Sequence, residues 1–171
     1  MAVAMVADVE GGLILESAFA SYARGVDVAA IITAHASCER DLLIRAAHWR
    51  ERGEPQPPAS YERWGLGGLL NYYRAQLPGD LFANLEQLNL RRRTLYHYGH
   101  SDGVTGVRDS TFAYVQRTGQ SQISDAYRRR YGQNPDQKEL LEFAADAMLR
   151  EQAIEAVQAA LAARSWATGG N

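Results

Sequence analysis

Apolar residues recur at the spacing of an α-helix along most of this chain, and no segment alternates apolar and polar residues as a half-buried strand does. Within residues 26–52, for example, Ile31, Cys38 and Leu42 recur at helical spacing. The chain has 171 residues, which is enough to bury a core without help from disulfides or metals. We therefore expect one all-α domain that spans residues 1–171.

Prolines, glycines and capping residues set the ends of the expected helices. Helices are expected at about residues 12–24, 26–52, 66–76, 81–97, 109–117, 121–131 and 135–164. Loops are expected at 53–60, which holds three prolines, and at 101–106, which holds two glycines. Asn134 is the expected cap of the last helix, and Leu13 and Phe19 of the first helix are available for burial in the core.

One short stretch, Asn89 to His100, has the composition of a chemical site. It places three consecutive arginines, Arg91–Arg93, before two histidines, His97 and His100, near the end of an expected helix. An arginine can hold a phosphate, and a histidine can move a proton near neutral pH. The stretch therefore contains the groups needed for phosphodiester chemistry without a metal.

Helical geometry divides these residues between two faces. Arg93, His97 and His100 are four and seven residues apart, which places them on one polar face together with Asn89. Arg92 falls on the other face, which is otherwise rich in leucine, and a charge there is costly to bury without a partner. We expect such a residue to face a cleft or an interface. Either arginine is thus a candidate partner for the histidines.

The spacing of the arginines and histidines also resembles a known signature. Four residues separate Arg92 from His97, five separate Arg91 from His97, and six separate Arg93 from His100. An arginine followed at such a spacing by a histidine, late in a helix of a small all-helical chain, resembles the Arg-x4-6-His signature of the HEPN superfamily.

Segments upstream of the signature extend this resemblance. Residues 16–25 and 29–43 are similar to the first two HEPN helices, so the resemblance covers about residues 13–105. It implies a HEPN-like up-down helical bundle, followed by a C-terminal helical extension at about residues 109–164.

The resemblance implies a metal-independent endoribonuclease, a toxin or defence effector that needs no cofactor. A neutral histidine would accept the proton of an RNA 2′-OH as that oxygen attacks the adjacent phosphate, and an arginine would stabilise charge on the phosphoryl oxygens. The products would be a 2′,3′-cyclic phosphate and a 5′-OH. HEPN ribonucleases pair two such clusters across a homodimer, which implies a composite site here. The catalytic candidates are Arg92, Arg93, His97 and His100.

Neighbours of the signature are candidates for supporting roles. Arg91 is expected to bind RNA, and Tyr96 and Tyr98 are expected to stack on bases, although aromatic residues in helices also serve in packing. Glu39 is expected to be a buried carboxylate that orients an arginine, with Asn89 as a further support. The alternative for the arginines is a solvated basic end of a helix, where cations meet the helix dipole favourably.

Composition excludes several other classes of function. The net charge is −2, so any contact with RNA must come from a local basic patch. His35, Cys38 and Glu39 do not match the spacing of a zinc site, and no metal is expected. No run reaches the ~20 apolar residues of a membrane helix, and the first ten residues lack the basic segment of a secretory signal. The expected location is the cytoplasm, with no membrane partner.

Three functions remain open from the sequence. The first is the endoribonuclease, with RNA as substrate and an antitoxin or regulatory protein as a further partner. The second is a non-catalytic HEPN-like module that binds RNA, a nucleotide or a protein. The third is a structural adaptor that uses the last helix for assembly. Convergence of His97 with Arg92 or Arg93 on a shared cleft would favour catalysis.

Overall fold

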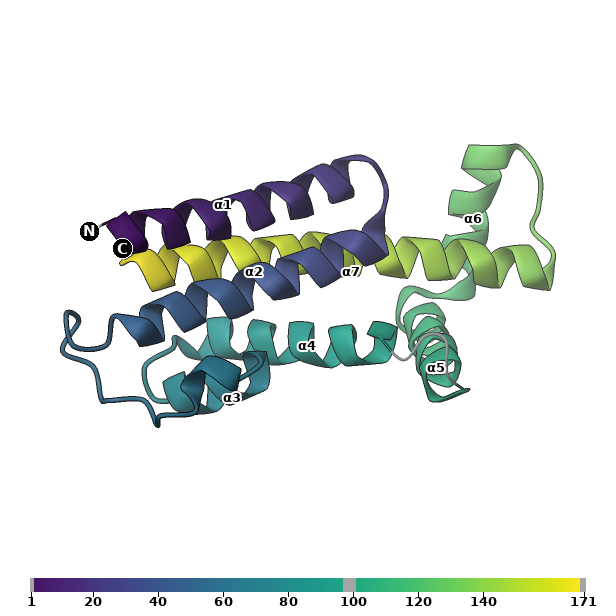
Figure 1. Ribbon diagram of the computed structural model, residues 1–171. Helices are drawn as coiled ribbons and strands as arrows, with labels where there is room; N and C mark the ends of the chain where they lie inside the picture. The colour runs from purple at the N-terminus through teal and green to yellow at the C-terminus, as the bar shows by residue number, and fades with distance from the viewer. Residues whose placement is uncertain (1, 97–100, 170–171) are drawn as a thin grey trace. The chain divides into compact units, whose positions relative to one another are not determined.

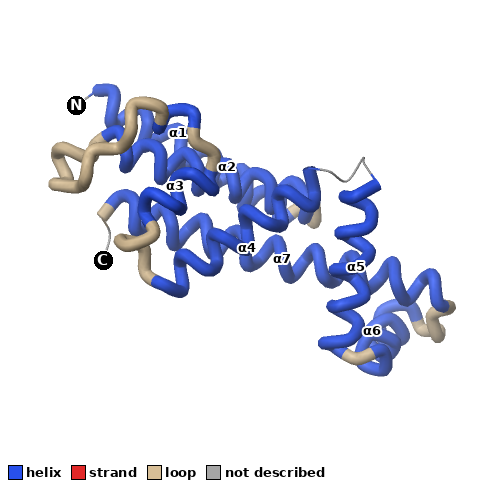
Figure 2. The backbone as a smooth tube through the Cα atoms, turned by 90° about the horizontal axis from the view of Figure 1, so that it is seen from below, coloured by secondary structure: helices blue, strands red, loops and turns tan. Residues whose placement is uncertain are grey.

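The computed structural model describes the backbone of residues 2–96 and 101–169, and the side chains of residues 11–95 and 106–169. Over these ranges the regular structure consists of helices only, which confirms the expected all-α class. The elements are α1 (Ala2–Ala23), α2 (Asp27–Ala47), the 3-10 helix η1 (Tyr61–Arg63), α3 (Leu66–Tyr73), α4 (Gly79–Tyr96), α5 (Ser101–Thr118), α6 (Gln120–Tyr131) and α7 (Gln137–Thr168) (Figure 1). The longest described loop joins α2 to α3, where the prolines lie (Figure 2).

The expectation of a loop at residues 101–106 is wrong, because α5 begins at Ser101 and includes this segment. Gly106 of this segment has a packing role. A Cβ atom at this position would lie only 2.9 Å from Cγ2 of Thr94, which belongs to the same compact unit. The glycine therefore leaves room for Thr94 and does not mark a turn.

The start of α7 also differs from the expectation, in which Asn134 is the cap. The helix begins at Gln137, and a capping box forms at its N-terminus. The Glu139 amide donates to Oδ1 of Asp136 at 2.8 Å, and the Asp136 amide donates to Oε2 of Glu139 at 2.9 Å. Asn134 instead accepts a hydrogen bond from Nε of Arg128 at 2.9 Å.

The chain divides into two compact units. The first consists of residues 1–92 and 153–171, and the second consists of residues 93–152. The C-terminal half of α7 thus belongs to the same unit as the N-terminal helices. The division expected from the sequence, a core at 13–105 and an extension at 109–164, instead places all of α7 in the extension. The single domain expected from the sequence stays a prediction.

In the first unit, α1 and α2 form an antiparallel hairpin that turns at Gly25, whose φ is 75° (Figure 1). Leu13 and Phe19 are 57% and 42% exposed, so the expectation that they enter the core is wrong. Among the described side chains of α1, which begin at Gly11, the buried residues are instead Gly11, Leu15 and Ala18, spaced by four and three residues. Because these residues are mostly small, α1 packs closely on its neighbours.

The core of the first unit is built from one apolar face of each helix. The buried side chains on its other helices include Ile31, Cys38 and Leu42 of α2, Leu66, Leu69 and Tyr73 of α3, Leu81, Leu85 and Leu88 of α4, and Ala156, Ala160 and Ala163 of α7. The burial of Ile31, Cys38 and Leu42 confirms the helical spacing that the sequence indicates for α2. The second unit has a smaller core, which consists of Ile123, Leu140 and Ala144 with Tyr114, Val115 and Phe143 against it.

Gly11 lies where α1 crosses a buried ion pair between α2 and α7. Nη1 of Arg164 donates to Oδ1 of Asp41 at 3.1 Å, and the Asp41 side chain is 3% exposed. A Cβ atom on Gly11 would collide with this Asp41 oxygen and would lie 2.8 Å from Nη1 of Arg164. The position therefore requires a glycine for steric reasons.

We expect Gly11→Ala to lower the free energy of unfolding by about 1–3 kcal/mol, because the new methyl group overpacks the ion pair. Gly12→Ala is the matched control. Its Cβ would lie 3.4 Å from Nη2 of Arg164, at the flexible end of that side chain, so it should be neutral or stabilising by up to about 1 kcal/mol through helix propensity. Urea denaturation followed by circular dichroism measures both. Equal stability of the two variants would contradict the close packing of α1.

Candidate functional site

The three arginines of α4 lie in different environments. Arg91 and Arg92 are half-buried, whereas Arg93 is exposed. Arg92 shares its face of the helix with the buried Leu85, Leu88 and Leu95, as the sequence predicts. Arg92, the arginine on the leucine-rich face, is therefore partly withdrawn from solvent, and burying its charge costs free energy.

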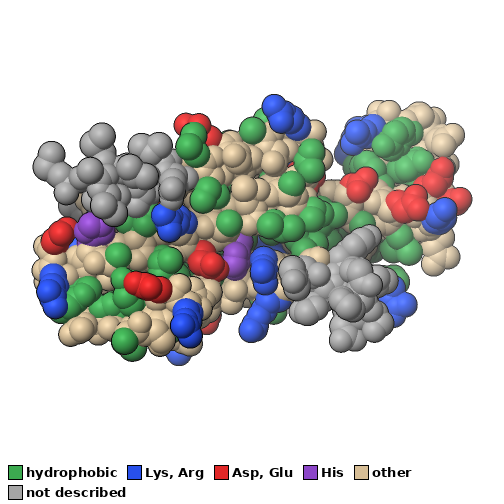
Figure 3. All heavy atoms as spheres, viewed as in Figure 1, with side chains coloured by type: hydrophobic (Ala, Val, Ile, Leu, Met, Phe, Trp, Pro, Cys, Tyr) green, Lys and Arg blue, Asp and Glu red, His purple; other side chains and the backbone are tan. Residues whose placement is uncertain are grey.

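A buried histidine on α2 lies against this part of α4. His35 is 7% exposed, and its Nε2 is 3.2 Å from Oδ1 of Asn89 in a hydrogen bond. In Figure 3 histidine, acidic and basic side chains lie side by side in the middle of the molecular face. The sequence assigns Asn89 a supporting role, and the structure gives Asn89 a specific partner, His35.

The environment of His35 favours its neutral form. Burial lowers the pKa of His35 below its ordinary value of 6.5, and the positive charge of Arg92 lowers it further. The hydrogen bond to Asn89 and the negative charge of Glu39 act in the opposite direction but do not prevail. Arg92 thus lies close enough to the imidazole to affect its protonation.

This depressed pKa predicts a pH dependence of stability. Below pH 6.5 the unfolded chain binds a proton at His35 while the folded chain does not, so stability is complete above pH 6.5 and falls as the pH drops toward the folded pKa. In the variant His35→Gln this part of the pH dependence should disappear, although the variant should be less stable. Melting temperatures from pH 5 to 8 measure the effect, with His48→Gln as a control that removes an imidazole elsewhere. An unchanged profile in His35→Gln would contradict the buried neutral histidine.

Glu39 makes a contact that the sequence does not predict. Its Oε2 accepts a hydrogen bond from the Leu66 amide at 3.0 Å, so the carboxylate binds the N-terminus of α3. A negative charge is favourable at this end of a helix. Glu39 therefore fixes α3 on α2, one helical turn from His35. The expectation of a buried carboxylate is wrong, because Glu39 is only half-buried, and its expected role in orienting an arginine stays a prediction.

Arg91 faces away from the His35 pair, toward α7. Its Nη2 forms an ion pair with Oε2 of Glu155, and both residues line a groove between α4 and α7. The guanidinium is 23% exposed and the carboxylate is 46% exposed. The positive charge of Arg91, which the sequence assigns to RNA binding, is thus partly neutralised within the folded chain.

Several candidate residues cannot be placed from the structure. His97, Tyr98 and His100 lie outside the described residues, and so does the side chain of Tyr96. The convergence of these histidines with Arg92 or Arg93 stays a prediction. The site residues that the structure does bring together are Asn89, Arg92 and Glu39, all of them near His35.

His35 is the one described member of this site that the sequence does not predict. Its spacing to Cys38 and Glu39 only raises the question of a metal site, which that spacing does not match. A signal was present, because Ile31, His35, Cys38 and Leu42 follow the spacing of one buried helical face. A histidine on such a face needs a polar partner, and Asn89 provides it.

Neither a metal centre nor a reactive thiol is indicated by the described side chains. No three His, Cys, Asp or Glu residues among them are grouped so that they could hold a metal ion. Burial raises the pKa of the Cys38 thiol far above its ordinary range, and the nearby Asp41 raises it further. Among the described residues, no helix is both long enough and apolar enough to cross a membrane.

Comparison of this chain with protein-family models, with curated proteins and with solved structures returns no match.

Proposed function

We propose that this protein is a metal-independent endoribonuclease of the HEPN type, with a HEPN-like bundle as its fold, which acts as a toxin or defence effector. The observation that carries the proposal is the position of Arg92. This arginine is half-buried on the leucine-rich face of α4, beside the His35–Asn89 pair, and it precedes His97 at the spacing of the HEPN signature. A partly desolvated guanidinium binds a phosphate more strongly than an exposed one.

The proposed reaction uses a base and a cation that binds the phosphate. His97 in its neutral form accepts the proton of the RNA 2′-OH, and Arg92 stabilises the charge that builds on the phosphoryl oxygens. The 2′-oxygen attacks the adjacent phosphorus, the bond from phosphorus to the 5′-oxygen breaks, and the leaving oxygen takes up a proton from water. His35 and Asn89 hold α2 against α4 beside Arg92 and thereby position it.

Exposed apolar residues around this region support a homodimer. Val28 and Ile32 are one turn apart on α2 and are 39% and 44% exposed, and Leu90 of α4, next to Asn89, is 55% exposed. A second copy of the chain that covers these side chains would bury apolar surface and would bring two arginine and histidine clusters together. The proposed active site is composite, with one cluster from each protomer.

The nature of the substrate tests the proposal. We expect the purified protein to cleave an RNA oligonucleotide in the presence of EDTA, and to leave intact both the DNA of the same sequence and the RNA with 2′-O-methyl groups, because these lack the attacking hydroxyl. Electrophoresis of the three labelled strands measures this. Cleavage of the DNA or of the methylated RNA would overturn the proposal.

A second candidate is a non-catalytic HEPN-like module that binds RNA, a nucleotide or a protein partner. It is favoured by the residue after Arg92, which is Arg93, where the commonest HEPN pattern has a polar residue that is often asparagine. The ion pair between Arg91 and Glu155 also reduces the positive charge available for a substrate. This candidate predicts binding of RNA without cleavage in the same experiment.

A further inference from the structure

A groove of about 500 Å³ runs between α4 and the C-terminal half of α7, within the first compact unit. This volume lies in the range of sites for small molecules. Asn84, Gln87 and Arg91 line it from α4, and Glu155 and Gln158 line it from α7. It lies on a different side of α4 from His35, so it is separate from the site described above.

The sequence builds this groove from one face of each helix. On α4 the residues Asn84, Gln87 and Arg91 follow one another by three and four positions, which is the spacing of one helical face. On α7 the floor residues Ala156 and Ala159 are also three positions apart, and they are 1% and 5% exposed. Because alanine side chains are short, the space between the two helices stays open.

The polar groups of the groove define the ligand that it fits. Arg91 and Glu155 form an ion pair, so their charges largely cancel and the groove offers no excess of positive charge for a phosphate. The three carboxamides of Asn84, Gln87 and Gln158 each present a donor and an acceptor. Such groups match the edge of a nucleobase, which carries donors and acceptors side by side.

The floor of the groove fits the flat face of the same ligand. This floor is an apolar surface, formed by Leu88, Ala156 and Ala159. We propose that this groove binds a nucleobase, with its ring on the alanine floor and its hydrogen-bonding edge toward the carboxamides. One part of this proposal rests on the proposed function. If the protein cleaves RNA, the bound base belongs to a nucleotide of the RNA that flanks the cleaved bond.

Binding of uncleavable ligands tests the groove separately from catalysis. The probes are the four free nucleosides and a 2′-O-methyl oligonucleotide of mixed sequence, and the signal is the nitrogen and proton shifts of the side-chain amides in nuclear magnetic resonance spectra. We expect the amides of Asn84, Gln87 and Gln158 to shift on addition of a probe. The double variant Gln87→Ala, Gln158→Ala should bind at least tenfold more weakly, because it loses two hydrogen bonds.

Two further variants complete the test. Ala162→Trp fills the groove from an exposed position of α7, so it should abolish binding without disturbing the core, as its melting temperature will show. Gln122→Ala, on the exposed surface of α6, is the matched control and should bind like the wild type. Binding of the oligonucleotide alone identifies an RNA base, whereas equally tight binding of a nucleoside identifies a free nucleoside or nucleotide as the ligand.

The proposal is overturned if no probe shifts these amides, or if the double variant and Ala162→Trp bind every probe as tightly as the wild type. Neither result depends on cleavage. If no RNA is cleaved but the amides shift, the groove is a nucleobase site in a protein that is not a nuclease. If RNA is cleaved but the amides do not shift, the protein is a nuclease and the groove is not a nucleobase site.

Discussion

Under the proposed mechanism, replacement of Arg92 by alanine is expected to lower the rate of RNA cleavage by about a hundred- to a thousandfold, since it would remove a preorganised donor to the phosphoryl oxygens. Arg93→Ala is the matched control, because it removes the same charge from the next residue, which is exposed. We expect less than about a tenfold loss for Arg93→Ala, because an exposed arginine contributes mainly long-range attraction for RNA. Initial rates on a fluorogenic RNA in EDTA measure both variants.

The folding of the two variants must be verified, because Arg92 is half-buried. Circular dichroism and melting temperatures show whether Arg92→Ala keeps its helices, and Arg92→Lys tests the role of the guanidinium beyond its charge. Lysine cannot bind a phosphate in the bidentate geometry of arginine, so an intermediate rate is expected. A wild-type rate in Arg92→Ala together with an inactive Arg93→Ala would show that the exposed face of α4 carries the chemistry instead.

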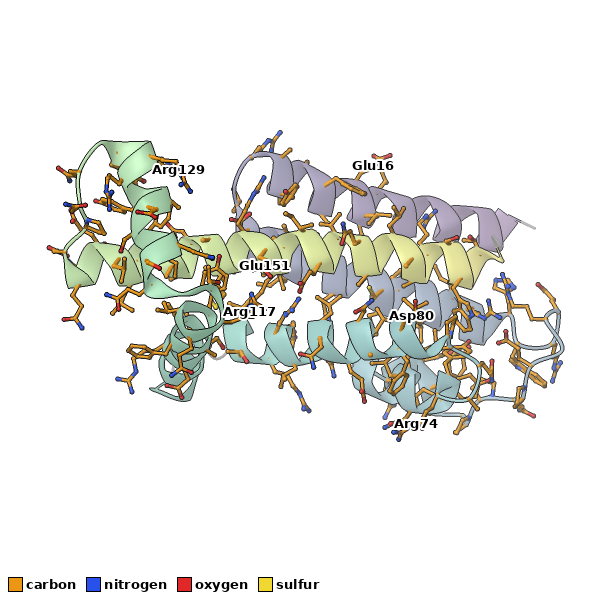
Figure 4. All side chains as sticks on the ribbon, turned by 180° about the vertical axis from the view of Figure 1, so that it is seen from behind. Glu16, Arg74, Asp80, Arg117, Arg129 and Glu151 are labelled. Atoms are coloured by element: carbon orange, nitrogen blue, oxygen red, sulfur yellow. The ribbon has the colours of Figure 1, made fainter. Side chains whose placement is uncertain are left out.

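Replacement of Arg164 by alanine is expected to lower the free energy of unfolding by about 3–5 kcal/mol, because it removes the positive charge that is paired with the buried carboxylate of Asp41. Arg117→Ala is the control. Arg117 also binds a carboxylate, through two contacts of 2.9 Å to Glu151, but its side chain is 65% exposed (Figure 4). An exposed pair of this kind contributes about 0–1 kcal/mol.

A second substitution separates the charge from the packing in this prediction. Asp41→Asn added to Arg164→Ala removes the buried negative charge, so it should recover part of the lost stability. Urea denaturation gives the free energy of unfolding of each variant. If Arg164→Ala loses no more than Arg117→Ala, the Asp41–Arg164 pair does not hold α2 and α7 together, contrary to the structure.

The helical class and most helix positions could be predicted because they depend on local spacing and on prolines. The burial of Ile31, Cys38 and Leu42 follows directly from that spacing. The errors arise where contacts between helices decide the outcome. Gly106 leaves room for the side chain of Thr94 and is not in a turn, and α1 buries small residues while Leu13 stays exposed. Both features are contacts between different segments of the chain, so the sequence of one segment does not predict them.

The candidate site was predictable in part for the same reason. The position of Arg92 on a leucine-rich face is a property of one helix, and the structure places it there, half-buried. The hydrogen bond between His35 and Asn89 joins residues that are 54 positions apart, and the ion pair between Arg91 and Glu155 joins α4 to α7. Such pairings depend on how the helices pack, which spacing alone does not specify.

We propose that this chain cleaves RNA through a histidine and without a metal. The most direct measurement is the cleavage of labelled total RNA in EDTA by the wild type and by His97→Ala, with chemical analysis of the product ends. We predict 2′,3′-cyclic phosphate and 5′-OH ends with the wild type and no such products with His97→Ala. Intact RNA with both proteins, or equal cleavage by both, would contradict the claim.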